Sequence, residues 1–193
     1  MNLPNKLTVS RMIIAPIFLL TLMLDKLPHN YLLSIVIFAI AAVTDALDGN
    51  LARKNNQITV FGKLLDPVAD KMLTTAAYLA FLKLGLCDVF SIMLILTREF
   101  AVTSIRLIAS AQGIVIPANT WGKIKTISQM VTIVLVMLMG ELHYCANTYG
   151  FMNFSFDTMQ IISYILVWIT VVLTVVSGII YFVQAKKRID FSK

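Results

Sequence analysis

Residues 45–70 read DALDGNLARKNNQITVFGKLLDPVAD, and this stretch holds four of the ten acidic residues of the chain. Asp45 and Asp48 are three residues apart, and Asp66 and Asp70 are four apart, so each pair shares a helix face. The first pair closes one apolar run, the second opens the next, and a short loop joins the two runs. A short loop makes the two helices antiparallel neighbours, so we expect all four carboxylates at one depth, just inside the inner leaflet of a membrane.

The composition around this cluster is that of a membrane protein. Hydrophobic residues make up 59% of the 193 residues and charged residues 13%, about half of the ~25% usual in soluble domains. This composition excludes a disordered chain and disfavours an ordinary soluble fold. The length allows roughly six spans of ~20 residues and leaves no room for a separate soluble domain. We therefore expect a single integral-membrane domain over residues 1–193.

The apolar runs predict an all-α, polytopic membrane protein with six transmembrane helices. The expected spans are residues 7–24, 31–54, 64–84, 89–112, 120–140 and 157–185. A short interfacial segment within residues 1–11 is expected to precede the first span, and a break from Glu141 to Phe156 is expected to precede the last.

Lysine and arginine set the orientation, because they concentrate on the cytoplasmic side of membrane proteins. With the N-terminus inside, the inner side holds Lys6, Arg11, Arg53, Lys54, Lys63, Lys71, Lys123, Lys125, Lys186, Lys187, Arg188 and Lys193. An even number of spans then places both termini in the cytoplasm. The net charge of +6 indicates attraction to anionic lipid or to a phosphate substrate at the membrane, and no nucleic-acid partner is expected.

Both histidines, His29 and His143, fall on the outer side in this orientation, so neither is available as a general base for cytoplasmic chemistry. Cys87 and Cys145 also fall there. A disulfide between them is one alternative, but two free thiols are favoured because a bundle held by a membrane needs no covalent staple.

The four carboxylates predict a divalent-metal site. Clustered and buried carboxylates resist ionisation unless a counter-charge is present. Mg²⁺ binds carboxylate oxygens and completes its shell with water and substrate phosphates, and Mn²⁺ has similar preferences. Two such ions ~3.5–4 Å apart suit a displacement at phosphorus.

Two other interpretations of the acidic cluster are less consistent with the sequence. Solvated charges at helix ends are disfavoured because cytoplasmic helix ends are usually basic. A divalent-cation transporter is disfavoured because the outward parts of the same spans, Leu32–Ala42 and Met72–Ala80, are apolar and offer no polar path.

Four basic residues are expected beside the carboxylates, where they would bind the phosphate of a small acceptor: Arg106, Lys123, Lys125 and Arg188. Arginine suits this task because it contacts phosphate through two parallel hydrogen bonds. Anchoring of helix ends or attraction to lipid headgroups remains an alternative for Lys123, Lys125 and Arg188. Arg98 and Glu99 lie near mid-membrane, so both should face the bundle interior and pair with other helices rather than with each other.

Residues 45–70 resemble the signature of the CDP-alcohol phosphotransferase family. This signature reads D-x-x-D-G-x-x-A-R, then eight residues, then G-x-x-x-D-x-x-x-D. Its fixed positions are matched by Asp45, Asp48, Gly49, Ala52, Arg53, Gly62, Asp66 and Asp70. Within this family the chain is most similar to the bacterial phosphatidylglycerophosphate synthases. That closer similarity rests on residues 4–11, Arg98-Glu99, Arg106, Gly113 and residues 122–129.

The resemblance implies a metal-dependent membrane enzyme, usually a homodimer, in the cell membrane with its active site facing the cytoplasm. It implies that Asp45, Asp48, Asp66 and Asp70 bind two divalent cations, Mg²⁺ or Mn²⁺, and that Asp70 is the base for the acceptor hydroxyl. The residues implied to hold the CDP-linked donor are Asp48, Gly49, Ala52, Arg53, Gly62, Asn5 and Thr8.

The reaction implied is transfer of a phosphatidyl group from CDP-diacylglycerol to glycerol 3-phosphate, which releases CMP. Inositol phosphate, serine and phosphatidylglycerol are alternative acceptors within the family. The basic trio of Arg106, Lys123 and Lys125 favours a phosphorylated acceptor over serine.

Overall fold

The computed structural model describes the backbone of residues 3–24, 26–54, 60–114, 117, 120–150 and 152–188. Side chains are described for residues 9–24, 26–44, 68–69, 71–114, 117, 120–150 and 152–188. The described residues form six helices, α1 (Leu3–Met23), α2 (Asn30–Lys54), α3 (Val60–Lys83), α4 (Val89–Ala111), α5 (Thr120–Tyr149) and α6 (Phe156–Lys186). All regular structure in these ranges is helical, which confirms the all-α prediction.

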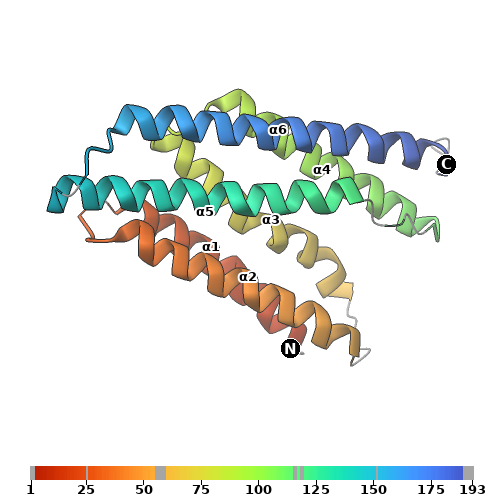
Figure 1. The fold of residues 1–193 in the computed structure, drawn as a ribbon. Helices are drawn as coiled ribbons and strands as arrows, with labels where there is room; N and C mark the ends of the chain where they lie inside the picture. The colour runs from red at the N-terminus through yellow and green to blue at the C-terminus, as the bar shows by residue number, and fades with distance from the viewer. Residues whose placement is uncertain are drawn as a thin grey trace.

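Successive helices run in opposite directions (Figure 1), as short connections between long helices require. The first residues of α1, α3 and α5 and the last residues of α2, α4 and α6 lie at one end of the bundle. The other ends of the six helices lie at the opposite end. Helix α1 packs on α2 and α3, α5 packs on α2 and α6, and α4 packs on α6. The acidic stretch therefore lies at the same end as the beginning of α5, far from it in sequence.

Three helix bounds differ clearly from those predicted. Helix α3 begins at Val60, four residues before the expected span. Helix α1 is continuous from Leu3, so in the described residues the expected N-terminal segment and the first span form one helix. Helix α5 continues through Glu141 to Tyr149, where a break was expected. Residues 141–149 contain no glycine or proline, and the next residue is Gly150, which has φ +65°, a conformation that glycine adopts without strain. The Gly150 N–H donates to the Ala146 carbonyl at 2.9 Å and closes the helix.

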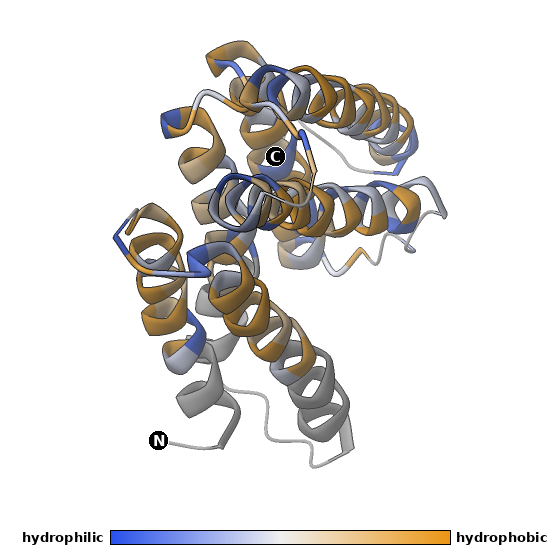
Figure 2. Cartoon of the chain, turned by 60° about the vertical axis from the view of Figure 1, so that its left-hand side comes forward, coloured by the Kyte–Doolittle hydropathy of each residue, from blue (hydrophilic) through white to orange (hydrophobic). Residues whose placement is uncertain are grey.

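Two helices of the described chain, α5 and α6, are long and apolar enough to cross a membrane. Val9–Met23 and Asn30–Thr44 are shorter apolar helical stretches, while charged residues interrupt the hydrophobic runs of α3 and α4. Figure 2 shows the apolar residues spread along the helices on both inner and outer sides. On α6, Ile161, Ile165 and Ile169 are all more than half exposed. A stripe of exposed isoleucine is expected on a surface that faces lipid.

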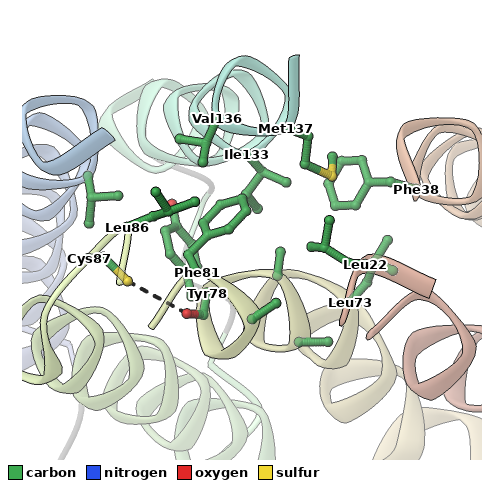
Figure 3. Packing of buried hydrophobic residues seen from close by; sticks show 14 of the residues in the cluster. Leu22, Phe38, Leu73, Tyr78, Phe81, Leu86, Cys87, Ile133, Val136 and Met137 are labelled. Carbon is green, nitrogen blue, oxygen red and sulfur yellow. Dashed lines mark hydrogen bonds between the residues drawn. The ribbon is translucent and has the colours of Figure 1, made fainter. Parts of the chain in front are cut away.

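The core joins α3 to the helices around it (Figure 3). Tyr78, Phe81 and Leu86, from α3 and the turn after it, pack against Ile133 and Met137 of α5, and all five are buried. Burial of each such side chain, compared with its exposure to water, contributes about 1.5–3 kcal/mol to the stability of the fold. In lipid the same contacts act mainly through close packing. This core fixes the position of α3 relative to α5, which matters for the site below.

The turn between α1 and α2 is tied to α5 through Glu141. The carboxylate of Glu141 is hydrogen-bonded to His29 Nδ1 and accepts from the Leu32 N–H at 3.2 Å and from Cys145 Sγ at 3.6 Å. His29 has φ +55°, which a non-glycine residue adopts only when its surroundings hold it there. Cys87 and Cys145 are free thiols, as the sequence predicted.

Candidate functional site

The four carboxylates within residues 45–70 lie on the consecutive helices α2 and α3. Asp45 and Asp48 belong to the last turns of α2, and Asp66 and Asp70 to the first half of α3. Their side chains lie outside the described part of the chain. The same holds for the residues predicted to bind the CDP-linked donor, Asn5, Thr8, Gly49, Ala52, Arg53 and Gly62. A set of four carboxylates fits Mg²⁺ or Mn²⁺ by its oxygen-donor chemistry.

The structure contains a cavity of about 640 Å³, and Lys71, the residue that follows Asp70 in the sequence, is part of its lining. Its walls come from α3, α4, α5 and α6. Five basic residues line it, namely Lys71, Arg98, Arg106, Lys123 and Lys125, together with one acidic residue, Glu99, among the described side chains. The excess of positive charge in a concave, partly desolvated site attracts anions and suits a phosphate group.

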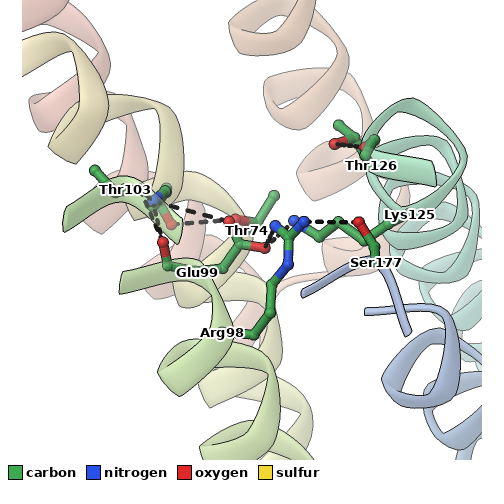
Figure 4. A network of polar contacts seen from close by, with 9 residues as sticks. Thr74, Arg98, Glu99, Thr103, Lys125, Thr126 and Ser177 are labelled. Carbon is green, nitrogen blue, oxygen red and sulfur yellow. Dashed lines mark hydrogen bonds and ion pairs between the residues drawn. The ribbon is translucent and has the colours of Figure 1, made fainter. Parts of the chain in front are cut away.

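Glu99 lies among the cations of the cavity (Figure 4). Its Oε1 forms a hydrogen-bonded ion pair with Lys125 Nζ. The Lys71 ammonium lies 3.9 Å from Oε2, donates to the Glu99 carbonyl at 2.7 Å and also donates to Thr103 Oγ1. Glu99 on α4 therefore contacts α3 and α5 at the same time.

Arg98 extends from the same turn of α4 to α6. One of its terminal nitrogens, Nη2, donates to Ser177 Oγ at 2.8 Å, and the other, Nη1, lies 3.5 Å from Glu99 Oε1. The expectation that Arg98 and Glu99 pair only with other helices was therefore half right. Adjacent side chains leave the helix in different directions, but the arginine side chain is long enough to return its guanidinium to the neighbouring carboxylate.

The other two cations of the cavity are more open. The Arg106 guanidinium carbon lies 5.9 Å from the centre of the Tyr181 ring, a cation–π distance, and Arg106 is exposed. Lys123, in the first turn of α5, is exposed as well, whereas Lys125 is only 4% exposed. The cavity thus brings together Arg106, Lys123 and Lys125. Arg188, in the turn after α6, is not among the described residues that line it.

Sequence reasoning missed Lys71 and Ser177 as cavity residues. Lys71 follows directly after Asp70 and was read only as a sign of orientation. Ser177 is a serine within a long apolar helix, where an unpaired hydroxyl is costly. Its place in an otherwise apolar span was a usable signal for a polar partner on a neighbouring helix.

A second polar cluster lies at the opposite end of the bundle. His29, Glu141 and Cys145 are the described histidine, cysteine and acidic residues whose possible ligand atoms come within 4.8 Å of one another. In this cluster the Glu141 carboxylate holds the imidazole, the thiol and the first turn of α2 by hydrogen bonds. The cluster thus has a sufficient structural role, and it is distant from the carboxylates predicted to bind metal.

Comparison with known proteins identifies the family. The chain is 35% identical over 192 residues to a CDP-diacylglycerol–glycerol-3-phosphate 3-phosphatidyltransferase of Bacillus subtilis, covering 94% of this chain and 93% of the relative. It is 34% identical to a protein of the same name from Rickettsia bellii, with 96% of each chain covered. A Pseudomonas fluorescens protein of that name is 38% identical over 144 residues, covering 71% of this chain and 72% of the relative. The sequence model of the CDP-alcohol phosphatidyltransferases matches residues 1–176, and the chain belongs to this family.

Proposed function

We propose that the protein transfers the phosphatidyl group of CDP-diacylglycerol to glycerol 3-phosphate and so produces phosphatidylglycerophosphate and CMP. The observation that carries the acceptor assignment is the cavity next to Asp70, with five basic residues and one acidic residue among its described lining. Such a cavity suits an acceptor that carries a phosphate group better than it suits serine, which carries none. The names of the similar proteins from B. subtilis and R. bellii support the same donor and acceptor.

Asp45, Asp48, Asp66 and Asp70 would hold the divalent cations on which this family generally depends. Two ions, Mg²⁺ or Mn²⁺, are proposed, because four carboxylates provide enough charge and enough oxygen ligands for two. When bound, the cations would supply electrostatic stabilisation of the phosphate groups. Asn5, Thr8, Asp48, Gly49, Ala52, Arg53 and Gly62 are proposed to hold the CDP moiety of the donor.

The residues of the chain would perform three tasks in the reaction. The basic cavity binds the phosphate of glycerol 3-phosphate and holds the reacting one of its two hydroxyls toward the donor. Asp70 takes the proton of that hydroxyl while the hydroxyl oxygen forms a bond to the phosphorus of the phosphatidyl group. The bond from this phosphorus to the CMP oxygen breaks, and CMP leaves. Binding the acceptor at a fixed place provides much of the rate, because it makes the attack effectively intramolecular.

The same proposal includes the membrane arrangement. All six helices would cross the cell membrane, with both termini and the basic cavity on the cytoplasmic side, and two copies would form a homodimer. The antiparallel succession of the six described helices and the basic residues at the carboxylate end support this orientation.

The test is CMP release by the purified protein in mixed micelles that contain CDP-diacylglycerol. Parallel reactions would contain glycerol 3-phosphate, inositol, inositol phosphate, serine or phosphatidylglycerol, each with Mg²⁺, Mn²⁺ or EDTA. We expect metal-dependent release with glycerol 3-phosphate alone. Release with another acceptor would overturn the acceptor assignment, and absence of release from folded protein with every acceptor would overturn the transferase assignment.

A further inference from the structure

We infer that Glu99 is a positioning residue that divides the cations of the cavity into two groups with different tasks. Lys71, Arg98 and Lys125 contact Glu99 and form the wall of the cavity. Arg106 and Lys123 are left to take the phosphate of the acceptor. This inference rests on the proposed function, because it assigns the binding of glycerol 3-phosphate within the same cavity.

The first group is defined by direct contacts. Lys125 is almost fully buried and its ammonium is paired with Glu99. Lys71 is held three times, by the Glu99 carboxylate, by the Glu99 carbonyl and by Thr103. Each hydrogen bond that these ammonium groups donate directs the ammonium toward the wall of the cavity. The ammonium is then less free to move with a bound ligand.

Arg98 joins this group through Glu99 and Ser177. Its Nη1 and Nη2 face these two partners, and its stem is packed against Gly178 of α6. The guanidinium is therefore oriented by two helices, α4 and α6, through Glu99 and Ser177. A guanidinium held in this way keeps one orientation. We therefore assign Arg98 to the wall of the cavity and not to the residues that bind the ligand.

The second group is defined by exposure. Arg106 and Lys123 both line the cavity, and both are exposed. Neither forms an ion pair with any side chain that the structure describes. Tyr181 supports the Arg106 guanidinium from one face, which leaves its N–H edge available for the paired hydrogen bonds that arginine makes with phosphate.

Electrostatics explains why an anion belongs in a phosphate cavity. Lys71, Arg98 and Lys125 come from three helices that meet at Glu99, and without a negative charge they repel one another. Buried cations without a counter-charge are expelled from a bundle interior or draw water into it. Glu99 therefore lets the three helices close around the cavity, while the total charge of the lining stays positive.

Two other roles for Glu99 make different predictions. If Glu99 competes with the substrate phosphate for Lys71 and Lys125, then its neutralisation frees two cations and lowers the KM for glycerol 3-phosphate. If Glu99 is only structural, then its neutralisation lowers the melting temperature and the yield of active enzyme, but it leaves both KM values unchanged. A positioning role raises the KM for the acceptor and leaves the KM for the donor in place.

The experiment compares Glu99→Gln and Glu99→Asp with Glu141→Gln. Glu141 is the matched control, because it is also a half-buried carboxylate on a long helix that pairs with a basic side chain, but at the opposite end of the bundle. We expect Glu99→Gln to raise the KM for glycerol 3-phosphate about tenfold or more with the KM for CDP-diacylglycerol within about twofold. Glu99→Asp should recover part of this loss, since it restores the charge on a shorter side chain.

A second pair of variants tests the division itself. Lys123→Gln should raise the KM for glycerol 3-phosphate with little change in melting temperature. Lys125→Gln combined with Glu99→Gln should be less harmful than Glu99→Gln alone, because it removes a cation that lacks its partner. The inference is overturned if Glu99→Gln lowers the acceptor KM, shifts both KM values equally, or gives the same kinetic profile as Glu141→Gln.

A binding measurement separates this inference from the proposed function. Calorimetric titration of wild-type protein and Glu99→Gln with glycerol 3-phosphate and with inorganic phosphate reports on the cavity without turnover. If the wild type releases no CMP with glycerol 3-phosphate, then the proposed function fails, yet weaker phosphate binding in Glu99→Gln would still support the role of Glu99. Equal phosphate binding by both proteins would overturn it.

Discussion

Arg98 crosses α6 directly over Gly178. A Cβ atom at position 178 would lie 2.7 Å from Arg98 Cγ, closer than two carbon atoms can approach without displacement. The absence of a side chain at this point lets the arginine extend to Ser177 on the same helix and place its guanidinium beside Glu99. One glycine on α6 thus sets the position of a cation in the cavity.

Gly178→Ala should therefore destabilise the protein, although alanine ordinarily favours a helix over glycine by about 1 kcal/mol. The added methyl group forces the base of the Arg98 side chain aside, and overpacking of this kind costs about 1–3 kcal/mol. The loss is measured as a lower melting temperature in detergent. Gly122→Ala on α5 is the control, since a Cβ there meets nothing within 4 Å. An equal or higher melting temperature for Gly178→Ala would contradict the packing described here.

Removal of the divalent metal should abolish CMP release, and Mg²⁺ or Mn²⁺ should restore it. Asp45→Asn and Asp66→Asn should each lower kcat by about two orders of magnitude or more, because an amide cannot replace a carboxylate in charge or in metal affinity. Both variants should remain folded and membrane-inserted, as judged by size-exclusion elution in detergent. Full activity of either variant would rule out its assignment to the metal site.

Glu141→Gln should loosen the end of the bundle opposite the cavity. The substitution replaces the carboxylate that is hydrogen-bonded to His29 and weakens the acceptor for the Leu32 N–H at the start of α2. Loss of a partly buried charged hydrogen bond costs about 1–3 kcal/mol, so the melting temperature should fall. The KM for glycerol 3-phosphate should stay within about twofold of the wild-type value. A change in that KM would show that the two ends of the bundle are coupled.

Cys87 should resist alkylation at neutral pH in the folded protein. Burial in the turn after α3, and to a lesser extent the neighbouring Asp88, raise the pKa of the Cys87 thiol to about 12. The thiol therefore stays protonated far above physiological pH, and the reactive form is the thiolate. Mass spectrometry of a Cys145→Ser variant treated with iodoacetamide at pH 7 and pH 9 should show an unmodified Cys87. Denatured protein, as the control, should be modified fully at pH 9.

The sequence alone predicts the carboxylate site, and its metal chemistry stays a prediction. The spacing of Asp45, Asp48, Asp66 and Asp70 depends only on helix periodicity and on the short loop between two helices, both of which are local. The all-α class and most helix bounds are also local, since they follow from runs of apolar residues. The end of α5 was predicted too early. Residues 141–149 continue the helix, and the contacts of Glu141 with His29 and Leu32 hold this part of the helix against residues far away in the sequence. A local pattern carries no information on these contacts.

The tertiary structure alone decided where the basic residues lie in the cavity. Sequence reasoning treated Lys123 and Lys125 alike, since they are two residues apart at one helix end. Packing of α5 against its neighbours buries Lys125 on Glu99 and leaves Lys123 open, because residues two apart lie on opposite sides of a helix. Which side faces α4 is set by the core between α3 and α5, far along the chain from either lysine, and local patterns in the sequence carry no information on that rotation.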